Sequence, residues 1–311
     1  MVYRAYFFVL LATFFFSSME VALKGMVGSI GPMQVNCTRF LLGGIFLIPF
    51  ALLELRKRGK VIGLKDWLSF SWLGFIGTVL SLTMFQLAVE CIPANIVAVI
   101  FCCNTVFVLF FAFLFFKVPV RAIQIVALFL SCLGMLFIIN PLETELPPHG
   151  LLLSVAAPVL FAVYAVLAGP FCRQFGAISV TSATFLCGSM EMLFLIVLGN
   201  TPWGSHLFGT LGLEFLCDVH MLDGYTLKNF LLMLYVSVGV SGCGFACYFH
   251  AQELASPLVA SLAFFVKPVL APLFAYILLG ENVTLFMLFG IILIVIGSFL
   301  VILDQKRKRA A

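Results

Sequence analysis

Residues 94–116 read ANIVAVIFCCNTVFVLFFAFLFF, an apolar run without a single charged side chain. A helix needs about 20 apolar residues to cross the hydrocarbon core of a bilayer, and this stretch is long enough to do so. Strands of a membrane barrel alternate apolar and polar residues, which this run does not. Because only helices and closed barrels satisfy the backbone in lipid, the run predicts a transmembrane helix.

Nine further stretches of the chain have the same character. Most of their boundaries carry charged residues, glycine or proline, which end an apolar helix at the membrane surface. Together the stretches predict an all-α integral membrane protein with ten transmembrane helices. Their approximate ranges are 5–23, 35–53, 68–89, 94–116, 121–140, 150–169, 178–198, 229–249, 257–279 and 284–303.

The composition agrees with this fold class. Of the 311 residues, 63% are hydrophobic and 10% are charged, and the mean hydropathy is +1.21. Soluble domains carry about 25% charged residues, so a soluble fold is excluded. The net charge is only +4, and the basic residues do not interleave with aromatic ones on a helix face. Nucleic-acid binding is therefore not expected.

No pattern of an enzyme or a metal site is visible. The chain has no HExxH, GxSxG or phosphate-binding loop sequence, and its four histidines are scattered. Its ten cysteines form no CxxC pair and most lie in apolar runs, which favours small buried hydrophobic residues. We expect neither enzymatic activity nor a cofactor nor a bound metal.

The basic residues predict the orientation. If the N-terminus is cytoplasmic, thirteen of the seventeen lysines and arginines lie on the cytoplasmic side and only Lys24 and Lys228 on the outer side, with Arg39 and Lys267 inside helices. Cytoplasmic loops of membrane proteins carry such an excess. We expect a multi-pass protein of a bacterial inner membrane with both termini in the cytoplasm.

The two halves of the chain resemble each other. A shift of 145 residues aligns their first parts, and a shift of 163 aligns their later parts. We therefore predict two repeats of five helices each, 1–143 and 144–311. An odd number of helices inverts the second copy, and inverted repeats are typical of secondary transporters with a site at the midplane. Matched positions include Ala12 and Ala157, Phe16 and Phe161, Glu90 and Glu253, and Phe101 and Phe264.

The difference between the two shifts places extra residues in an outer loop at about 200–228. This loop holds Trp203, His206 and His220 among other large side chains. Two interpretations stay open: a cap or membrane-surface segment at the outer mouth, and a variable surface loop.

Several motifs resemble the drug/metabolite transporter superfamily, in particular its EamA-type members, over nearly the whole chain. They are the stretch from Phe16 to Lys24, Arg39-Phe40-Leu41, the stretch from Ala251 to Pro257, Lys267-Pro268, and Leu279-Gly280-Glu281. The first half departs from the family pattern at Asn104-Thr105 and at Lys117-Val118. The resemblance implies a ten-helix, proton-linked or facilitated carrier, often an exporter of amino acids or related metabolites.

Lys267 is the most prominent candidate site residue, because it lies near the middle of an apolar helix. A charge there costs at least about 2.5–3.5 kcal/mol, so it faces a cavity or a partner. Pro268 and Pro272 follow it and predict a kink or break in the helix. Lys267 would bind a substrate carboxylate. Alternatively, a glutamate of the predicted helix at 5–23 or of the one at 178–198 neutralises it.

Other ionisable residues give further candidates. Glu191 lies deep in the predicted helix at 178–198. It could carry a proton, bind a substrate amine or pair with Lys267. Glu20 is a candidate for substrate binding or coupling, but Glu20 and Lys24 also have the spacing of a local ion pair. Arg39 either snorkels to the interface or forms an outer-gate ion pair with Glu20 or Glu90.

Four neutral polar residues inside the helices complete the candidates. They either line a cavity or pack against neighbouring helices. They are Gln86, Asn104, Tyr164 and Tyr248.

We therefore expect a secondary transporter that works by alternating access. A lysine facing the carboxylate and a glutamate facing the amine would suit an amino acid or a related zwitterion. The partners would be this solute, the lipid bilayer and protons, and a homodimer stays open. The alternatives are a non-transporting scaffold or a carrier of nucleosides or lipophilic cations.

Overall fold

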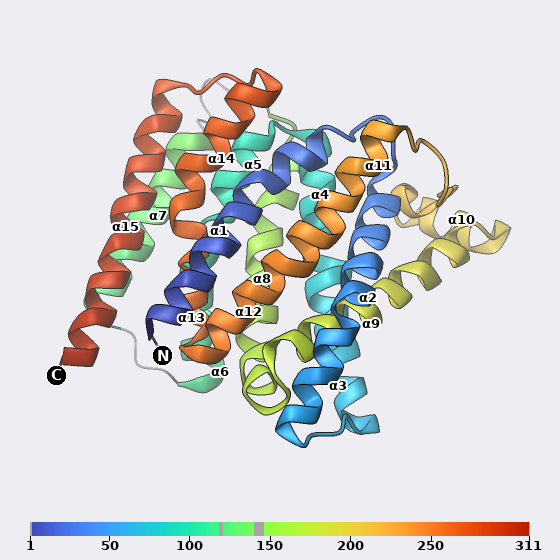
Figure 1. The fold of residues 1–311 in the computed structure, drawn as a ribbon. Coiled ribbons are helices and arrows are strands. Elements are labelled where there is room, and N and C mark those ends of the chain that lie inside the picture. The colour runs from blue at the N-terminus through green and yellow to red at the C-terminus, as the bar shows by residue number, and fades with distance from the viewer. Residues whose placement is uncertain (1, 118–120, 140–145, 311) are drawn as a thin grey trace.

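The computed structural model describes residues 2–117, 121–139 and 146–310. Within them every regular element is a helix, and the helices form one bundle (Figure 1). Seven helical segments are long and apolar enough to cross a membrane, and three shorter apolar helices accompany them. These ten segments coincide with the ten predicted stretches, so the prediction of an all-α, multi-helix membrane fold is confirmed.

The first half of the bundle contains seven α-helical elements and one π-helix. The π-helix η1 joins α3 to α4 without a gap, and Cys102 and Cys103 separate α5 from α6. The bounds are α1 (Val2–Lys24), α2 (Pro32–Arg58), α3 (Leu64–Gly74), η1 (Phe75–Ser81), α4 (Leu82–Cys91), α5 (Ala94–Phe101), α6 (Asn104–Phe116) and α7 (Ala122–Ile139).

The second half has the same kinds of irregularity. The π-helix η3 joins α11 to α12, and Ser261 and Leu262 separate α13 from α14. The bounds are α8 (Pro148–Phe175), α9 (Ala177–Gly199), α10 (Pro202–Thr210), η2 (Glu214–Leu216), α11 (Leu227–Leu234), η3 (Tyr235–Gly244), α12 (Phe245–Leu254), α13 (Pro257–Ala260), α14 (Ala263–Leu279) and α15 (Leu285–Ala310).

The helices of the two halves pack on each other in matching pairs. Helix α1 packs against α12 and α14, and α8 packs against α4 and α6. Helix α2 lies against α9, and α7 lies against α15 (Figure 1). The first helix of each half thus contacts the later helices of the other half.

Glycines allow the closest of these contacts. A Cβ atom on Gly74 of α3 would lie 2.8 Å from the backbone nitrogen of Gly188 in α9, and one on Gly188 would lie 2.9 Å from the Gly74 carbonyl oxygen. Likewise, a Cβ on Gly134 of α7 would lie 2.6 Å from the carbonyl oxygen of Gly290 in α15. Small residues let helix backbones approach in lipid, where no hydrophobic effect draws helices together.

The bundle has two ends, a terminal end and a distal end. At the terminal end α1 begins and α15 ends; at the distal end α1 ends and α2 begins (Figure 1). The segment predicted as the outer loop contains α10 and η2 and lies beside α9 at the distal end. The Gln34 amide of α2 donates to the carbonyl oxygens of Met221 and Asp223 and anchors this segment.

Candidate functional site

An ion pair between Glu20 and Lys267 lies at the centre of the bundle. Glu20 comes from α1 and Lys267 from α14, two helices that pack against each other. Both side chains are buried, with exposed fractions of 1% and 0%. A buried charge without a partner is very costly, so each residue depends on the other. Of the two predicted partners for Lys267, the structure has the glutamate of the first helix.

Aromatic rings surround the lysine. Its Nζ atom lies 5.2 Å from the ring centroid of Phe101, 5.7 Å from that of Phe264 and 5.8 Å from that of Phe85. Phe16 stacks on Phe264 with ring centroids 5.5 Å apart. A cation near the faces of aromatic rings is attracted by their quadrupoles. These aromatic rings therefore stabilise a positive charge at this place, whether the charge is that of Lys267 or of another group.

The interruptions of the two broken helices meet at this place. Cys102 and Cys103 directly follow Phe101, and Ser261 and Leu262 lie just before Phe264. The Thr105 hydroxyl donates to the Ser261 carbonyl oxygen over 3.0 Å and joins the two breaks. Non-helical backbone at membrane depth is tolerated where it is buried in protein or lines a cavity.

The position of the second break corrects one of the two alternatives predicted from proline, a helix broken at Pro268 and Pro272; the other alternative, a kink, stays a prediction. Helix α14 continues through Pro268 and Pro272, and the break lies before it, at Ser261 and Leu262. Proline removes one backbone donor, but the rest of the helix holds because neighbouring helices support it. The prolines were therefore a sign of an irregular helix, and they do not mark the break itself.

Arg39 of α2 is fully buried in the bundle. Its Nε donates to the Asn36 side-chain oxygen over 3.2 Å, and its Cζ lies 4.4 Å from the centroid of the Phe40 ring. Its Nη1 and Nη2 atoms make no hydrogen bond to any residue that the structure describes. Glu20 lies near enough to act electrostatically on this guanidinium. The predicted snorkelling of Arg39 to the interface is wrong, because the side chain points into the protein.

Three of the four predicted neutral residues, Asn104, Tyr164 and Tyr248, lie in different surroundings. The Asn104 amide donates to the Pro158 carbonyl oxygen over 3.0 Å, and the Tyr164 hydroxyl bonds that of Thr184 over 2.9 Å. The Tyr248 hydroxyl has no hydrogen-bond partner among the described residues, and its ring centroid lies 5.7 Å from that of Phe264. Tyr248 therefore packs with the aromatic rings near Lys267, whereas Asn104 and Tyr164 hold helices together.

Glu191 is not part of the group formed by Glu20, Lys267 and the aromatic rings around the lysine. Its carboxylate accepts a hydrogen bond from the Ser71 hydroxyl of α3. It lines a shallow surface groove together with Phe75, Met190, Phe194 and Leu195. Since Lys267 pairs with Glu20, the alternative in which Glu191 neutralises Lys267 is wrong.

At the distal end, charged side chains hold helix termini. The Lys24 ammonium donates to the carbonyl oxygens of Val89 and Ile92 at the end of α4, over 2.7 and 3.1 Å. The predicted local pair of Lys24 with Glu20 is thus replaced by contacts with another helix. Glu90, the third predicted gate residue, is partly buried and within electrostatic range of Lys24.

A second distal contact joins the two halves. The Glu281 carboxylate accepts hydrogen bonds from the backbone N–H groups of Ala94 and Asn95, both over 2.9 Å. A carboxylate at a helix N-terminus satisfies free donors and complements the helix dipole. Glu281, which lies between α14 and α15, therefore fixes the start of α5.

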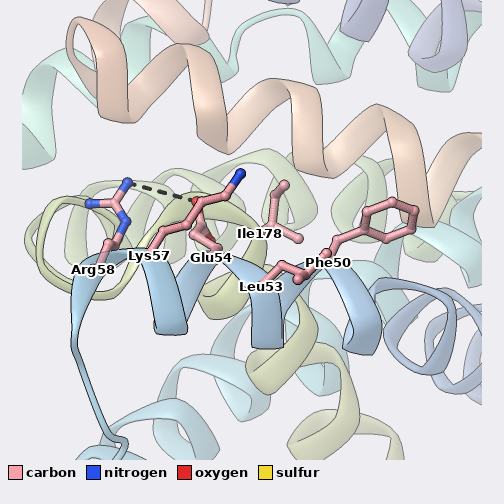
Figure 2. A pocket seen from close by; sticks show the side chains of 6 residues that line it. All are labelled: Phe50, Leu53, Glu54, Lys57, Arg58 and Ile178. Atoms are coloured by element: carbon pink, nitrogen blue, oxygen red, sulfur yellow. Dashed lines mark ion pairs between the residues drawn. The ribbon is translucent and has the colours of Figure 1, made fainter.

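At the terminal end, sequence reasoning missed an ion-pair cluster. The Arg58 guanidinium pairs with the Glu253 carboxylate of α12. It also lies 3.7 Å from the Glu54 carboxylate, and Figure 2 shows this second ion pair within α2. Glu253 also accepts from the backbone N–H of Ala177, and Glu54 accepts from the N–H and hydroxyl of Ser179. Glu253 matches Glu90 in the repeat alignment, and that match was the available signal.

This cluster also has donors suited to a metal ion. One ligand atom each of Glu54, His250 and Glu253 lies within 4.8 Å of the others. However, the Arg58 guanidinium already pairs with the Glu253 carboxylate and would repel a cation there. The arrangement can close α2, α9 and α12 against one another, and we treat it as an ion-pair cluster.

Comparisons with known proteins agree with one another. The model of the EamA-like transporter family matches residues 3–140 and 148–303. An uncharacterized transporter of Clostridium kluyveri is 29% identical over 98% of this chain and 94% of its own length. Protein PecM of Dickeya dadantii is 24% identical over 89% of this chain and 86% of its own. A crystal structure with 17% identity covers 99% of both chains with a TM-score of 0.70, which shows a shared fold.

Proposed function

Because the chain belongs to the EamA-like transporter family, we propose that it is a secondary transporter that exports a small zwitterionic metabolite, an amino acid or a close relative. It is a multi-pass membrane protein, and the relative from Clostridium kluyveri is named as a transporter. Beyond membership of this family, we propose the class of solute, export as the direction of transport, and alternating access as the mechanism.

The buried pair of Glu20 and Lys267 is the observation that carries the proposal. Two opposite charges lie where two broken helices meet, and aromatic rings surround them. A substrate ammonium can replace the Lys267 ammonium at Glu20 in the same aromatic surroundings. The released Lys267 charge offers a means of coupling transport to protons, which we propose as the coupling ion.

The mechanism uses the two halves, 1–143 and 144–311, as inverted repeats that rock against each other. In support, α1 packs on the later helices of the second half while α8 packs on those of the first. The distal contacts of Lys24 and Glu281 and the terminal cluster of Arg58 then act as two gates. Each gate opens while the other holds, because breaking both sets of contacts at once is more costly.

We propose that both ends of the chain lie in the cytoplasm of a bacterial cell, with the protein in the inner membrane. The excess of basic residues at the terminal end supports this orientation. A K60C variant and a G209C variant, each on a background without native cysteines, test it with an impermeant maleimide. We expect Gly209→Cys to react in intact cells and Lys60→Cys only after permeabilisation; the reverse pattern would invert the topology.

Transport by the purified protein in liposomes tests the function. Radiolabelled amino acids are screened with and without an imposed pH gradient, and Lys267→Met is compared with Arg56→Met, which removes an exposed cation. We expect saturable, gradient-driven flux that Lys267→Met abolishes and Arg56→Met retains. Unchanged flux in Lys267→Met would refute the role of the central pair. Flux of nucleosides or lipophilic cations alone would refute the solute class, and no flux at all would favour a scaffold.

A further inference from the structure

The guanidinium of Arg39 is buried with most of its hydrogen-bond donors unpaired among the described residues. Arginine carries five N–H donors in a planar fork, and here only Nε has an acceptor among the described residues. The side chain is fully buried, so Nη1 and Nη2 are not in contact with bulk water. Buried donors without acceptors cost free energy, so such a group in a protein calls for an explanation, and a bound ion is one of them.

The balance of charge in the interior points to an anion. Among the residues that the structure describes, the fully buried charged side chains are Glu20, Arg39 and Lys267. Two cations face one carboxylate, and Lys267 takes that carboxylate in a direct ion pair. One positive charge is left over, and it lies on the residue whose donors are free. An incoming anion would restore neutrality.

The geometry selects the kind of anion. A guanidinium fork binds the two oxygens of a carboxylate in parallel, which a lysine ammonium cannot do. The sequence had assigned the substrate carboxylate to Lys267, but that ammonium is already occupied. The Phe40 ring under the Arg39 guanidinium has its centroid 4.7 Å from that of Phe185 and 6.0 Å from that of Phe245. The ring that faces the guanidinium thus belongs to a cluster of aromatic rings.

We propose that Arg39 binds the carboxylate of the transported solute, and that the solute is a small monocarboxylate with an apolar body. This inference rests on the proposed transport function and assigns one end of its substrate. Glu20 and the aromatic rings around Lys267 remain for the ammonium where the solute has one. The solute thus lies between α2 and the pair formed by α1 and α14.

Three probes with one carbon skeleton test the inference on the wild-type protein in detergent. They are L-leucine, 4-methylpentanoate, which lacks the amine, and isopentylamine, which lacks the carboxylate. Thermal unfolding is recorded with each probe at millimolar concentration, and with inorganic phosphate. We expect both carboxylates to raise the melting temperature and the amine and phosphate to have no effect. Equal stabilisation by the amine, or stabilisation by phosphate alone, would overturn the inference.

A matched pair of variants locates the site. Arg39→Lys keeps the charge but removes the fork, and Arg56→Lys makes the same change on an exposed residue of the same helix. We expect Arg39→Lys to weaken carboxylate binding about tenfold or more and Arg56→Lys to leave it unchanged. Equal affinity in both variants would overturn the assignment. If Arg39→Lys does not fold, the wild-type comparison still decides the class.

The outcomes separate this inference from the proposed function. Carboxylate-selective binding without flux in liposomes would refute transport and keep the site. Flux that does not distinguish the amine from the carboxylates would keep transport and refute the role of Arg39.

Discussion

Glu20 and Lys267 form an ion pair between the first helix of one half of the chain and a broken helix of the other half. Neither residue has another charged partner in direct contact among the described side chains. The pair therefore links α1 to α14 electrostatically at a place where solvent does not screen it. Its role in stability and its role in transport can be separated by experiment.

Single and double substitutions of this pair are expected to behave differently. Glu20→Gln or Lys267→Met leaves a buried charge alone and should destabilise the protein by about 3–5 kcal/mol. The double variant removes both charges of the pair, but Arg39 then loses the attraction of Glu20, so it should recover only part of that stability and no transport. Thermal unfolding and liposome flux measure the two properties. Full transport by the double variant would show that the pair is only structural.

Glu253→Gln should open the terminal end. The change removes the charge that pairs with Arg58, and it weakens the acceptor of the Ala177 N–H. Cys172 is buried and lies within electrostatic range of this cluster, so its thiol reports on opening. We expect its maleimide labelling, followed by mass spectrometry, to become several-fold faster. Glu214→Gln, a change at an exposed carboxylate, is the control; equal rates in both would mean that the cluster does not close this end.

Gly74→Ala should loosen the contact of α3 with α9. The new methyl group would lie 2.5 Å from the Thr184 carbonyl oxygen and 2.8 Å from the Gly188 nitrogen, so the helices must move apart. Overpacking of this kind costs about 1–3 kcal/mol. Gly209→Ala meets no atom within 4 Å and serves as the matched control. A melting temperature lowered equally by both changes would contradict the close contact.

Glu281→Gln should destabilise the start of α5. The amide is a weaker acceptor than the carboxylate for the N–H groups of Ala94 and Asn95, and it carries no charge to complement the helix dipole. Loss of a good N-terminal cap costs about 0.5–2 kcal/mol. Thermal unfolding beside Glu214→Gln measures the effect. Equal stability of the two variants would show that Glu281 does not hold α5.

Much of the fold could be predicted from the sequence. The run at 94–116 and its nine companions became helices at nearly the expected positions, because apolar length is a local property. The sequence also singled out Lys267 and Glu20, since a charged residue in an apolar helix is visible without any knowledge of its neighbours.

The pairing of those charges could not be predicted in the same way. The spacing of Glu20 and Lys24 favoured a local pair, yet Lys24 reaches the end of α4 and Glu20 reaches α14. Arg39 was expected near an interface and is buried. Each partner depends on how a helix is rotated and which helix crosses it, and hydropathy carries neither quantity.

The sequence by itself determined that this chain is a membrane protein of about ten helices, with a lysine held in its interior. Only the tertiary structure decided that Glu20 neutralises that lysine, that the helix breaks lie at Cys102–Cys103 and Ser261–Leu262, and that the Arg39 side chain is buried. The physical reason is how far apart in the sequence the interacting residues lie. Transfer of a segment into lipid depends on its own residues, whereas an ion pair depends on distant segments that meet only when the helices pack.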